Sequence, residues 1–407
     1  MEVPRTLPVR LHAGRKESVI IVSKGKDPYQ TTKKALQKTA LPHLRGKKIL
    51  IKPNAARLAS PGEGVTTHPG VVAATIDHLR ERGVDDIVVG ESCIFGVDSR
   101  KAFQMTGMQE VSEKTGVPLI DLDRGDAAEI TIPKGRLVKK IKVPAMLKEM
   151  DFVISIPVMK THMHTGVTLS IKNMKGLLWR KQKARFHHLA EDKHSAQDAK
   201  TLDVAISEMA SVLFPHLAII DGTVGMEGMG PAYGGAKKMG VVIVGENALS
   251  ADAVAARLMG LAPETVPHLR LSAEKGLGEI RLEKIPVEPR DYLKWENPFA
   301  PPPSELSLPF PDVVVHDEGS CSACLSTLVV FLQKYHMHLG GYRLEDGHVH
   351  IGIGRHLKDC PKGTIRIGNC TAHIKERGPF VLGCPPVGSQ VLDALGISFS
   401  GSPSKKK

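Results

Sequence analysis

The stretch that decides the fold begins with KILIKPN, residues 48–54, a short apolar run that ends in a lysine and an asparagine. A loop rich in Gly, Pro and Ser follows, and VVAATIDHLRERG, residues 71–83, then repeats apolar residues with the period of a helix. Pro69 stands near the expected start of this helix and Gly83 at its expected end. These segments therefore predict a strand followed by an amphipathic helix.

The same alternation continues to residue 123. DDIVVGES, residues 85–92, predicts a second strand, a helix is expected at 101–114, and PLIDLD, residues 118–123, predicts a third strand. Strands that alternate with helices in this way form a parallel, doubly wound sheet. The expected fold class is α/β, with a mostly parallel sheet domain followed by a small Cys-containing α/β domain.

The flanking segments extend this pattern in both directions. On the N-terminal side we expect a strand at 18–24 and a helix at 28–44, and past residue 123 a hairpin at 129–145. Residues 177–200 are basic and rich in His, which could make them a mobile cover over a site. Further expected elements are a helix at 196–213, a strand at 216–222, a Gly-rich loop at 223–235, a strand at 240–247 and helices at 250–260 and 269–278.

Changes in composition predict the domain boundaries. Residues 1–285 form the expected α/β domain with a basic ligand crevice, and the Pro-rich stretch 286–312 is typical of a semi-rigid linker. Residues 313–399 contain most of the cysteines and predict a compact domain that binds a metal or cluster. The last residues, 400–407, are basic and small and predict a disordered tail.

The composition limits the classes of function. The chain has 407 residues and a net charge of +12, which admits an acidic substrate, nucleic acid or an anionic membrane face. Only 4% of residues are aromatic and the basic residues are scattered, which disfavours nucleic-acid binding. No apolar run approaches the roughly 20 residues needed to cross a bilayer. The N-terminal residues lack the apolar core of a secretory signal, so we expect a cytoplasmic protein with no membrane partner.

The segment DFVISIPVMKTHMHTGVTLSIKNMKG, residues 151–176, is the centre of the expected site. Its first apolar run, 152–158, ends before Lys160, and its second, 167–171, ends before Lys172. We expect two strands whose polar ends meet at one edge of the sheet, where ligands bind in open α/β folds. Lysines at such an edge favour an anionic small molecule.

Other expected strands also end in polar residues. The candidate substrate-binding residues are Lys52, Asn54, Thr67, His68, Glu91, Ser92, Thr161, Asn173, Lys175 and Asp221, and the candidate catalytic residues are His162, Lys160 and Lys172. Each of them alone could be a surface residue or a turn former, but their recurrence at one side of a parallel sheet predicts a shared pocket.

The residue types suggest roles within this pocket. Lysines would supply positive charge for phosphate or carboxylate oxygens. His162 is the candidate general acid or base because an imidazole titrates near neutral pH. His164 could form a metal pair with it or be a solvated loop residue. Asp221 could orient a lysine, hold a Mg²⁺ ion or form a turn before Gly222.

Five of the six cysteines lie between residues 321 and 384. Cys321 and Cys324 form a CxxC pair at the start of an expected helix, while Cys370 and Cys384 follow expected strands. Four such thiolates could hold a [4Fe–4S] cluster or a zinc ion, and the lack of a second close pair favours iron–sulfur. Cys360 could be an alternative ligand or an ordinary buried thiol.

Several motifs occur together in a fixed order: IKPN, TTHP, GES, PVMKTHMHTGVTLSIKNMKG, DG with MEGMGP, and GVVIVGEN with ADAVAARLMG. This series, over most of residues 48–277, resembles the domain-of-unknown-function 362 family. The resemblance implies an iron–sulfur-associated protein, although the ferredoxin-type CxxCxxCxxxCP run of some members is absent. The family name implies no reaction.

Three functional hypotheses follow. The first is an iron–sulfur protein, a redox enzyme or electron carrier, that acts on an anionic ligand and exchanges electrons with a partner protein. The second is a non-redox transferase or ligase of a phosphorylated substrate with a structural zinc site. The third is a nucleic-acid-binding protein, which would bind with a steep dependence on salt.

Overall fold

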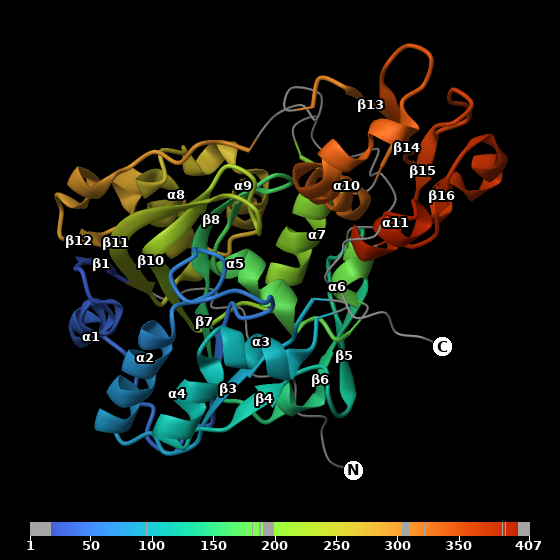
Figure 1. Cartoon of the computed structure of the whole chain (residues 1–407). Helices are drawn as coiled ribbons and strands as arrows, with labels where there is room; N and C mark the ends of the chain where they lie inside the picture. Colours follow the sequence, from blue (N-terminus) through green and yellow to red (C-terminus); the bar gives the residue numbers. More distant parts are fainter. Residues whose placement is uncertain are drawn as a thin grey trace. The chain divides into compact units, whose positions relative to one another are not determined.

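The computed structural model describes residues 18–94, 97–180, 182–186, 189, 199–302, 310–320, 322–384, 386 and 388–397. The chain divides into two compact units, Met1–Pro302 and Pro303–Lys407, called here the N-terminal and C-terminal units (Figure 1). The expected disordered tail, 400–407, lies outside the described residues.

A ten-stranded sheet forms the middle of the N-terminal unit. Its main order is β12, β1, β11, β10, β7, β2, β3, β4, and β8 and β9 extend it beside β10. The bounds are β1 Ile20–Lys24, β2 Ile49–Pro53, β3 Ile87–Glu91, β4 Leu119–Asp121, β7 Phe152–Ile156, β8 Val158–His162, β9 Gly166–Thr168, β10 Leu217–Glu227, β11 Gly235–Gly245 and β12 Val287–Glu288.

The sheet is mostly parallel, which confirms the expected α/β fold class. Strands β10, β7, β2, β3 and β4 run parallel to one another, whereas β11 is antiparallel to both β10 and β1. In β2, Ile49 lies opposite Ile87 of β3 on one side and Phe152 of β7 on the other. Because central strands are covered on both faces, they are continuously apolar rather than alternating.

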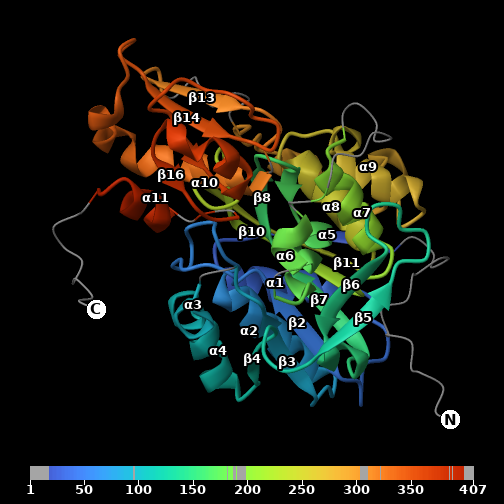
Figure 2. The ribbon, with the colours of Figure 1, turned by 90° about the vertical axis from the view of Figure 1, so that its right-hand side faces the viewer.

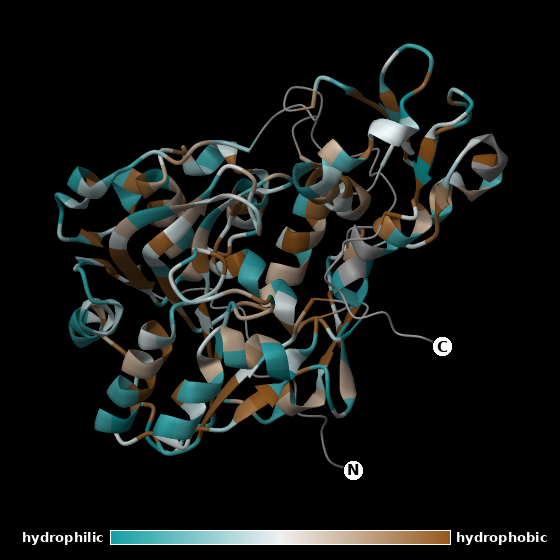
Figure 3. Ribbon diagram, viewed as in Figure 1, coloured by the Kyte–Doolittle hydropathy of each residue, from teal (hydrophilic) through white to brown (hydrophobic). Residues whose placement is uncertain are grey.

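Helices cover both faces of this sheet (Figures 1 and 2). One apolar cluster joins α1, α2 and α4 to one face, and a second joins α5, α7, α8 and α9 to the other. Figure 3 shows hydrophobic residues along the central strands and hydrophilic residues over α1. The bounds are α1 Pro28–Lys38, α2 Pro69–Glu81, α3 Ser99–Met105, α4 Met108–Thr115, α5 Ser170–Asn173, α6 Gln182–Arg185, α7 Thr201–Ala210, α8 Ala248–Leu258 and α9 Pro267–Glu274.

Several helix boundaries differ from the sequence-based expectation. The helix expected at 28–44 ends at Lys38, and Thr39 is already extended. The helix expected at 101–114 is two helices, because Gly107 between them adopts a left-handed conformation with φ of 74°. The hairpin expected at 129–145 is present as β5 Ala127–Thr131 and antiparallel β6 Lys140–Pro144.

The interpretation of 151–176 as two strands that end before their lysines was wrong. The first strand, β7, stops at Ile156, and after Pro157 a new strand, β8, runs through Lys160 to His162 beside β10. The second apolar run is mostly not a strand, since β9 ends at Thr168 and α5 begins at Ser170. Lys172 and Asn173 therefore lie on a short helix.

The expected linker at 286–312 also differs from the structure. Residues up to Pro302 belong to the N-terminal unit, where β12 pairs with β1. Tyr292 and Phe299 are each only 6% exposed and join the main apolar cluster. Aromatic side chains therefore attach this Pro-rich segment to the unit, which proline content alone did not reveal. Residues 303–309 lie outside the described part of the chain.

The C-terminal unit has its own four-stranded parallel sheet, in the order β13, β14, β15, β16. Helices α10 and α11 pack on it, and buried residues such as Leu328, Phe331 and Val391 close an apolar core with the strands. The bounds are β13 Val313–Asp317, α10 Ser322–Tyr335, β14 Val349–Ile353, β15 Ile365–Ile367, β16 Phe380–Val381 and α11 Gly388–Ala394. The sequence analysis missed β13.

Candidate functional site

The candidate site lies where strands β2 and β7 are neighbours. From β2 the chain proceeds to β3 and β4 on one side, while β7 and β10 lie on the other side. The segments that leave the carboxyl ends of β2 and β7 therefore diverge, which is the topological arrangement at which open α/β sheets bind ligands. Polar side chains from β2, β3, β8 and α5 meet there.

Lys52 on β2 forms a buried ion pair with Glu91 on β3. Its ammonium group donates to Glu91 Oε2 at 2.9 Å, to Asn173 Oδ1 at 2.9 Å and to the Pro53 carbonyl at 2.8 Å. Both ionic side chains are 1% exposed. Burial lowers the pKa of Lys52, and the Glu91 carboxylate opposes that shift. These three hydrogen bonds use all three ammonium protons, so Lys52 holds the surrounding residues in place and has no proton left for a ligand.

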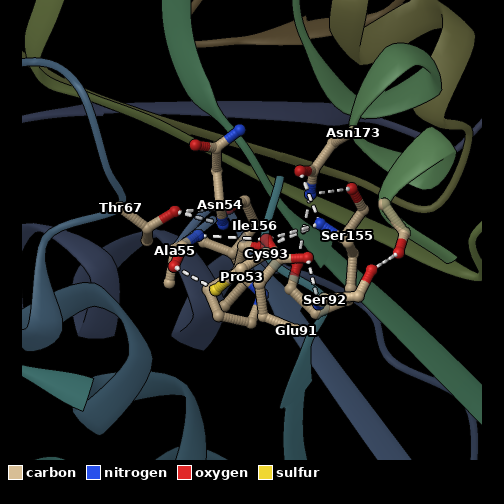
Figure 4. A network of polar contacts seen from close by, with 12 residues as sticks. Pro53, Asn54, Ala55, Thr67, Glu91, Ser92, Cys93, Ser155, Ile156 and Asn173 are labelled. Carbon is tan, nitrogen blue, oxygen red and sulfur yellow. Dashed lines mark hydrogen bonds and ion pairs between the residues drawn. The ribbon is translucent and has the colours of Figure 1, made fainter. Parts of the chain in front are cut away.

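Glu91 and Asn173 connect this ion pair to the surrounding strands (Figure 4). Glu91 accepts hydrogen bonds from the backbone N–H groups of Ala55 at 3.0 Å and Ser92 at 2.8 Å. The Asn173 amide donates to Ser155 Oγ on β7 at 3.0 Å and to the Lys52 carbonyl at 3.2 Å. One buried network thus joins β2, β3, β7 and α5.

Lys160 is a second buried lysine, 2% exposed, but it has no acidic partner in its hydrogen-bond set. Its ammonium group donates to the carbonyls of Val65 at 2.5 Å and Pro231 at 3.3 Å and to Asn54 Oδ1 at 3.4 Å. Its pKa is lowered well below the ordinary value by burial and by the nearby charges of Arg57 and Lys172. All three acceptors are neutral, so its charge is not compensated by them.

Arg57 and Lys172 complete a cationic triad with Lys160. Both are half-buried, and among the described residues neither side chain has a hydrogen bond or ion pair. Burial lowers the pKa of each, and the Arg57 charge contributes to lowering the pKa of Lys172 to about 7. We did not single out Arg57 from sequence, although it follows the IKPN motif by only three residues.

Lys175 and Lys183 lie near the same region. Burial, Lys172 and Lys183 lower the pKa of Lys175 well below its ordinary value. Lys183 is compensated, because its ammonium group pairs with Asp123 Oδ2 at 2.6 Å and donates to Ser92 Oγ at 2.7 Å. The Ser92 hydroxyl in turn donates to the Gly176 carbonyl. Lys183 was another residue that the sequence analysis did not name.

Three predicted site residues hold the loop after β2. Thr67 Oγ1 donates to the Ile156 carbonyl at 2.6 Å and accepts from the Asn54 N–H at 2.8 Å. His68 caps α2, with Nδ1 accepting from the Gly70 N–H at 3.1 Å. Asp221 accepts from the N–H of His68 at 2.7 Å and, through its other oxygen, from Thr223. Burial raises the pKa of Asp221.

Thr161 and His162 lie on β8 and are buried. Thr161 Oγ1 donates to the Gly228 carbonyl at 3.0 Å, which attaches β8 to the loop between β10 and β11. His162 Nδ1 accepts from the N–H of His164 at 3.1 Å, and the two imidazole rings meet edge to face with centroids 5.6 Å apart. An imidazole that accepts at Nδ1 can donate only from Nε2 in its neutral form.

Asp252 on α8 positions the helix that carries Lys172. Its carboxylate accepts hydrogen bonds from the N–H groups of Ser170 at 2.7 Å and Ile171 at 2.9 Å, at the start of α5. Burial raises the pKa of Asp252 to about 7, although the two hydrogen bonds act to lower it. The sequence alone could have pointed to Asp252, because it is the one acidic residue in the apolar helix ALSADAVAARL.

The cysteines of the C-terminal unit follow the carboxyl ends of its parallel strands. Cys324 is on the first turn of α10, after β13, and a Cβ built on Gly368 would lie 3.3 Å from its Sγ. Cys370 and Cys384 follow β15 and β16, and the Asn369 N–H donates to the Gly383 carbonyl at 2.9 Å. Over the part of the chain that the structure describes, no three or more His, Cys, Asp or Glu side chains are arranged to hold a metal. Cys321 lies outside that part.

These features define a doubly wound α/β domain with a cationic group at its topological switch point. The family model described as Domain of unknown function (DUF362) matches residues 49–257, about half of the chain, and the protein belongs to this family. This confirms the resemblance found in the sequence motifs.

The chain is similar to proteins of known sequence and of known structure. The thylakoid-associated protein sll1697 of Synechocystis sp. is 28% identical over 268 residues, which cover 65% of this chain and 80% of that protein. The lactate racemase apoprotein of Thermoanaerobacterium thermosaccharolyticum superposes with a TM-score of 0.42 and 12% identity, over 86% of this chain and 70% of that one.

None of the helices in the described part of the chain is both long enough and apolar enough to cross a bilayer.

Proposed function

We propose that the N-terminal unit binds an anionic small molecule at the cationic triad of Arg57, Lys160 and Lys172. The observation that carries this proposal is that three cations, all at least partly buried, affect one another electrostatically, and no carboxylate among the described residues pairs with any of them. Burying uncompensated like charges costs free energy, and an anionic ligand would recover much of it.

The direct test is isothermal titration calorimetry of the full chain with sulfate, a divalent anion, at low salt. Arg57→Met is expected to weaken binding at least tenfold, since it removes one of the accessible cations. Lys134→Met is the matched control, because it removes the same charge from an exposed position in the β5–β6 hairpin. Equal affinity in both variants and the parent would contradict the proposal.

We propose further that the C-terminal unit holds a [4Fe–4S] cluster through Cys321, Cys324, Cys370 and Cys384. In support, the described members of this set follow the carboxyl ends of three strands of one parallel sheet, and such ends share an edge. An all-thiol donor set suits an iron–sulfur cluster, and also zinc. When bound, the cluster would supply one-electron transfer, and the protein would act as a redox protein on its anionic ligand.

Metal analysis of anaerobically purified protein tests this second proposal. We expect about four iron and four sulfide per chain, with an electron paramagnetic resonance signal after reduction. Cys384→Ser should lose the cluster, whereas Cys360→Ser is the comparison variant and should retain it. Stoichiometric zinc without iron would instead support the alternative, a non-redox transferase or ligase with a structural zinc site.

Asp221 was expected as a possible Mg²⁺ ligand. Both of its carboxylate oxygens already accept hydrogen bonds, one from His68 and the other from Thr223. These bonds brace the loop after β2 against β10 and leave one lone pair on Oδ2, so a Mg²⁺ ion at Asp221 stays a prediction.

A further inference from the structure

We infer that the anion bound at the cationic triad is a compact dianion, the phosphoryl group of a small phosphorylated molecule. This inference rests on the proposed anion site and adds the chemical class of the ligand. It depends on three properties of the site: the electrostatic coupling of its cations, their excess over nearby acids, and the kind of hydrogen-bonding groups that face them.

The three cations come from three different elements, yet their charges affect one another. Arg57 is on the loop after β2, Lys160 is on β8, and Lys172 is on α5. Each pair in the triad is electrostatically coupled: Lys160 is affected by both Arg57 and Lys172, and Lys172 by Arg57. The Lys160–Asn54 hydrogen bond brings β8 to the same loop that carries Arg57. This hydrogen bond, taken together with the coupling, supports one compact charge as the ligand rather than two separated carboxylates.

The cations of this region outnumber the acidic side chains that pair with them, which favours a ligand with more than one negative charge. Glu91 compensates Lys52 at 2.9 Å, and Asp123 compensates Lys183 at 2.6 Å. Both Glu91 oxygens already accept hydrogen bonds. The triad can carry up to three positive charges, when Lys160 and Lys172 are both protonated, and none of its members has an acidic partner among the described residues. A monocarboxylate carries only one negative charge, whereas a phosphate monoester carries about 1.5 to 2 at pH 7 in one group of atoms.

Among the described residues, the side chains of Arg57 and Lys172 and the NH₂ group of Asn54 are donors that have no hydrogen-bond acceptor. Lys160 can only donate, so the oxygen of the Asn54 amide must face it, and the NH₂ group is directed elsewhere. Asn54 is half-buried and precedes Arg57 by three residues, and Figure 4 shows its amide extending away from the Glu91 network. A guanidinium fork, an amide NH₂ and an ammonium group suit a ligand whose oxygens only accept, as phosphoryl oxygens do.

The experiment compares anions of different shape and charge by calorimetry on the full chain at constant ionic strength. The probes are inorganic phosphate, ethyl phosphate, succinate and acetate. We expect both phosphates to bind, succinate at least tenfold more weakly, and acetate more weakly still. Ethyl phosphate distinguishes the phosphoryl group of a larger molecule from free phosphate: loss of binding on esterification would overturn the assignment to a phosphorylated molecule.

Two variants sharpen the test. Arg57→Lys keeps the charge but removes the planar fork, and it is expected to weaken ethyl phosphate binding at least threefold while succinate changes less. Asn54→Asp replaces the amide donor with an acid and should weaken phosphate binding at least tenfold. Circular dichroism checks that each variant is folded, and Lys134→Met serves as the charge control.

The outcomes separate this inference from the function on which it rests. Succinate or acetate binding as tightly as phosphate would overturn the phosphoryl assignment and leave the anion site standing. Failure of every probe to bind, with no difference between the parent and Arg57→Met, would overturn both.

Discussion

Lys172 is a half-buried lysine whose ammonium group titrates near neutral pH. Its pKa is about 7, lowered by burial and by Arg57, while Asp203 partly opposes the shift. An anion should bind the protonated form, so affinity should follow the protonated fraction. That fraction falls about tenfold between pH 6 and pH 8, and the dissociation constant for sulfate is expected to rise by about the same factor. Sulfate keeps its charge over this range, so calorimetry reports the protein alone.

Lys172→Arg provides the matched control, because a guanidinium remains charged across the range. Its sulfate affinity should be nearly independent of pH, and a slope as steep as that of the parent would show that another group titrates. A rise in pH weakens sulfate binding but increases the stability of the fold. Between pH 7 and the ordinary lysine pKa the folded state binds fewer protons than the unfolded state, so the free energy of unfolding rises with pH in this window.

The Lys52–Glu91 ion pair leads to a second prediction at the residue scale. Lys52→Met leaves a buried carboxylate without its cation, which is expected to cost about 3 kcal/mol of unfolding free energy. The loss should lie at the low end of the range for buried pairs, since Ala55 and Ser92 still donate to Glu91. The double variant with Glu91→Gln should lose less than the sum of the two single losses.

Urea unfolding of the parent, the two single variants and the double variant measures this coupling. Lys114→Met is a control for an exposed pair, since Lys114 and Glu110 are both largely solvent-accessible, and it should cost less than about 0.5 kcal/mol. Strict additivity of Lys52→Met and Glu91→Gln would contradict the described network.

Sequence reasoning at this scale found the residue types but not their pairing. Lys52 and Lys160 both follow apolar runs, and no local pattern shows that one faces Glu91 whereas the other faces only carbonyl and amide oxygens. Those partners lie between 39 and 106 residues away along the chain. Arg57 stands in an irregular loop without periodicity, so only the three-dimensional arrangement relates it to Lys160 and Lys172.

At the scale of elements, the short helix α5 is the part of the site most dependent on outside support. It has only four residues, and an isolated helix of that length is not stable. The Asp252 carboxylate supplies acceptors for its first N–H groups. Asp252→Ala is expected to cost about 1–3 kcal/mol of stability and to displace Lys172, so that sulfate affinity falls at least fivefold.

Asn247→Ala separates these two effects. Asn247 caps α8 itself by accepting from Leu249 and Ser250, so its loss should cost about 1 kcal/mol while sulfate affinity is kept. Equal affinity in Asp252→Ala and Asn247→Ala would show that α5 does not depend on Asp252. Calorimetry and thermal unfolding on the same samples provide both quantities.

The elements also show where hydrophobic patterns are informative. The alternation over 48–123 predicted β2, α2, β3 and β4 because each of those strands is an ordinary member of a parallel sheet. The pattern failed at 152–162, where Pro157 interrupts the strand and β8 continues through polar residues that are nevertheless buried. A buried polar strand cannot be recognised from hydrophobicity, because its partners are what make burial tolerable.

At the scale of the whole molecule, the boundary between the two units is the feature that composition misplaced. A Pro-rich stretch is typical of a linker, but residues 286–302 return to the N-terminal unit through specific contacts. The backbone N–H groups of Asn297 and Phe299 donate to the carbonyls of Leu258 and Met259, at 3.0 and 2.9 Å. A Cβ built on Gly225 would lie 2.6 Å from the Met159 carbonyl oxygen and 2.8 Å from the Phe299 ring, and these two neighbours explain a glycine at that point of β10.

A truncation series tests this boundary. A chain that ends at Pro302 keeps the whole N-terminal unit, whereas one that ends at Ile285 loses β12 and the buried rings of Tyr292 and Phe299. Removal of one buried aromatic side chain costs about 3–5 kcal/mol, so the shorter chain should melt at least 10 °C lower or fail to fold. Phe299→Ala in the full chain should reproduce part of that loss, and Leu293→Ala, at a position 42% exposed, should have little effect. Thermal unfolding followed by circular dichroism measures the melting temperature of each protein. If the two truncated chains melt within about 3 °C of each other, the N-terminal unit ends at residue 285 and not at Pro302.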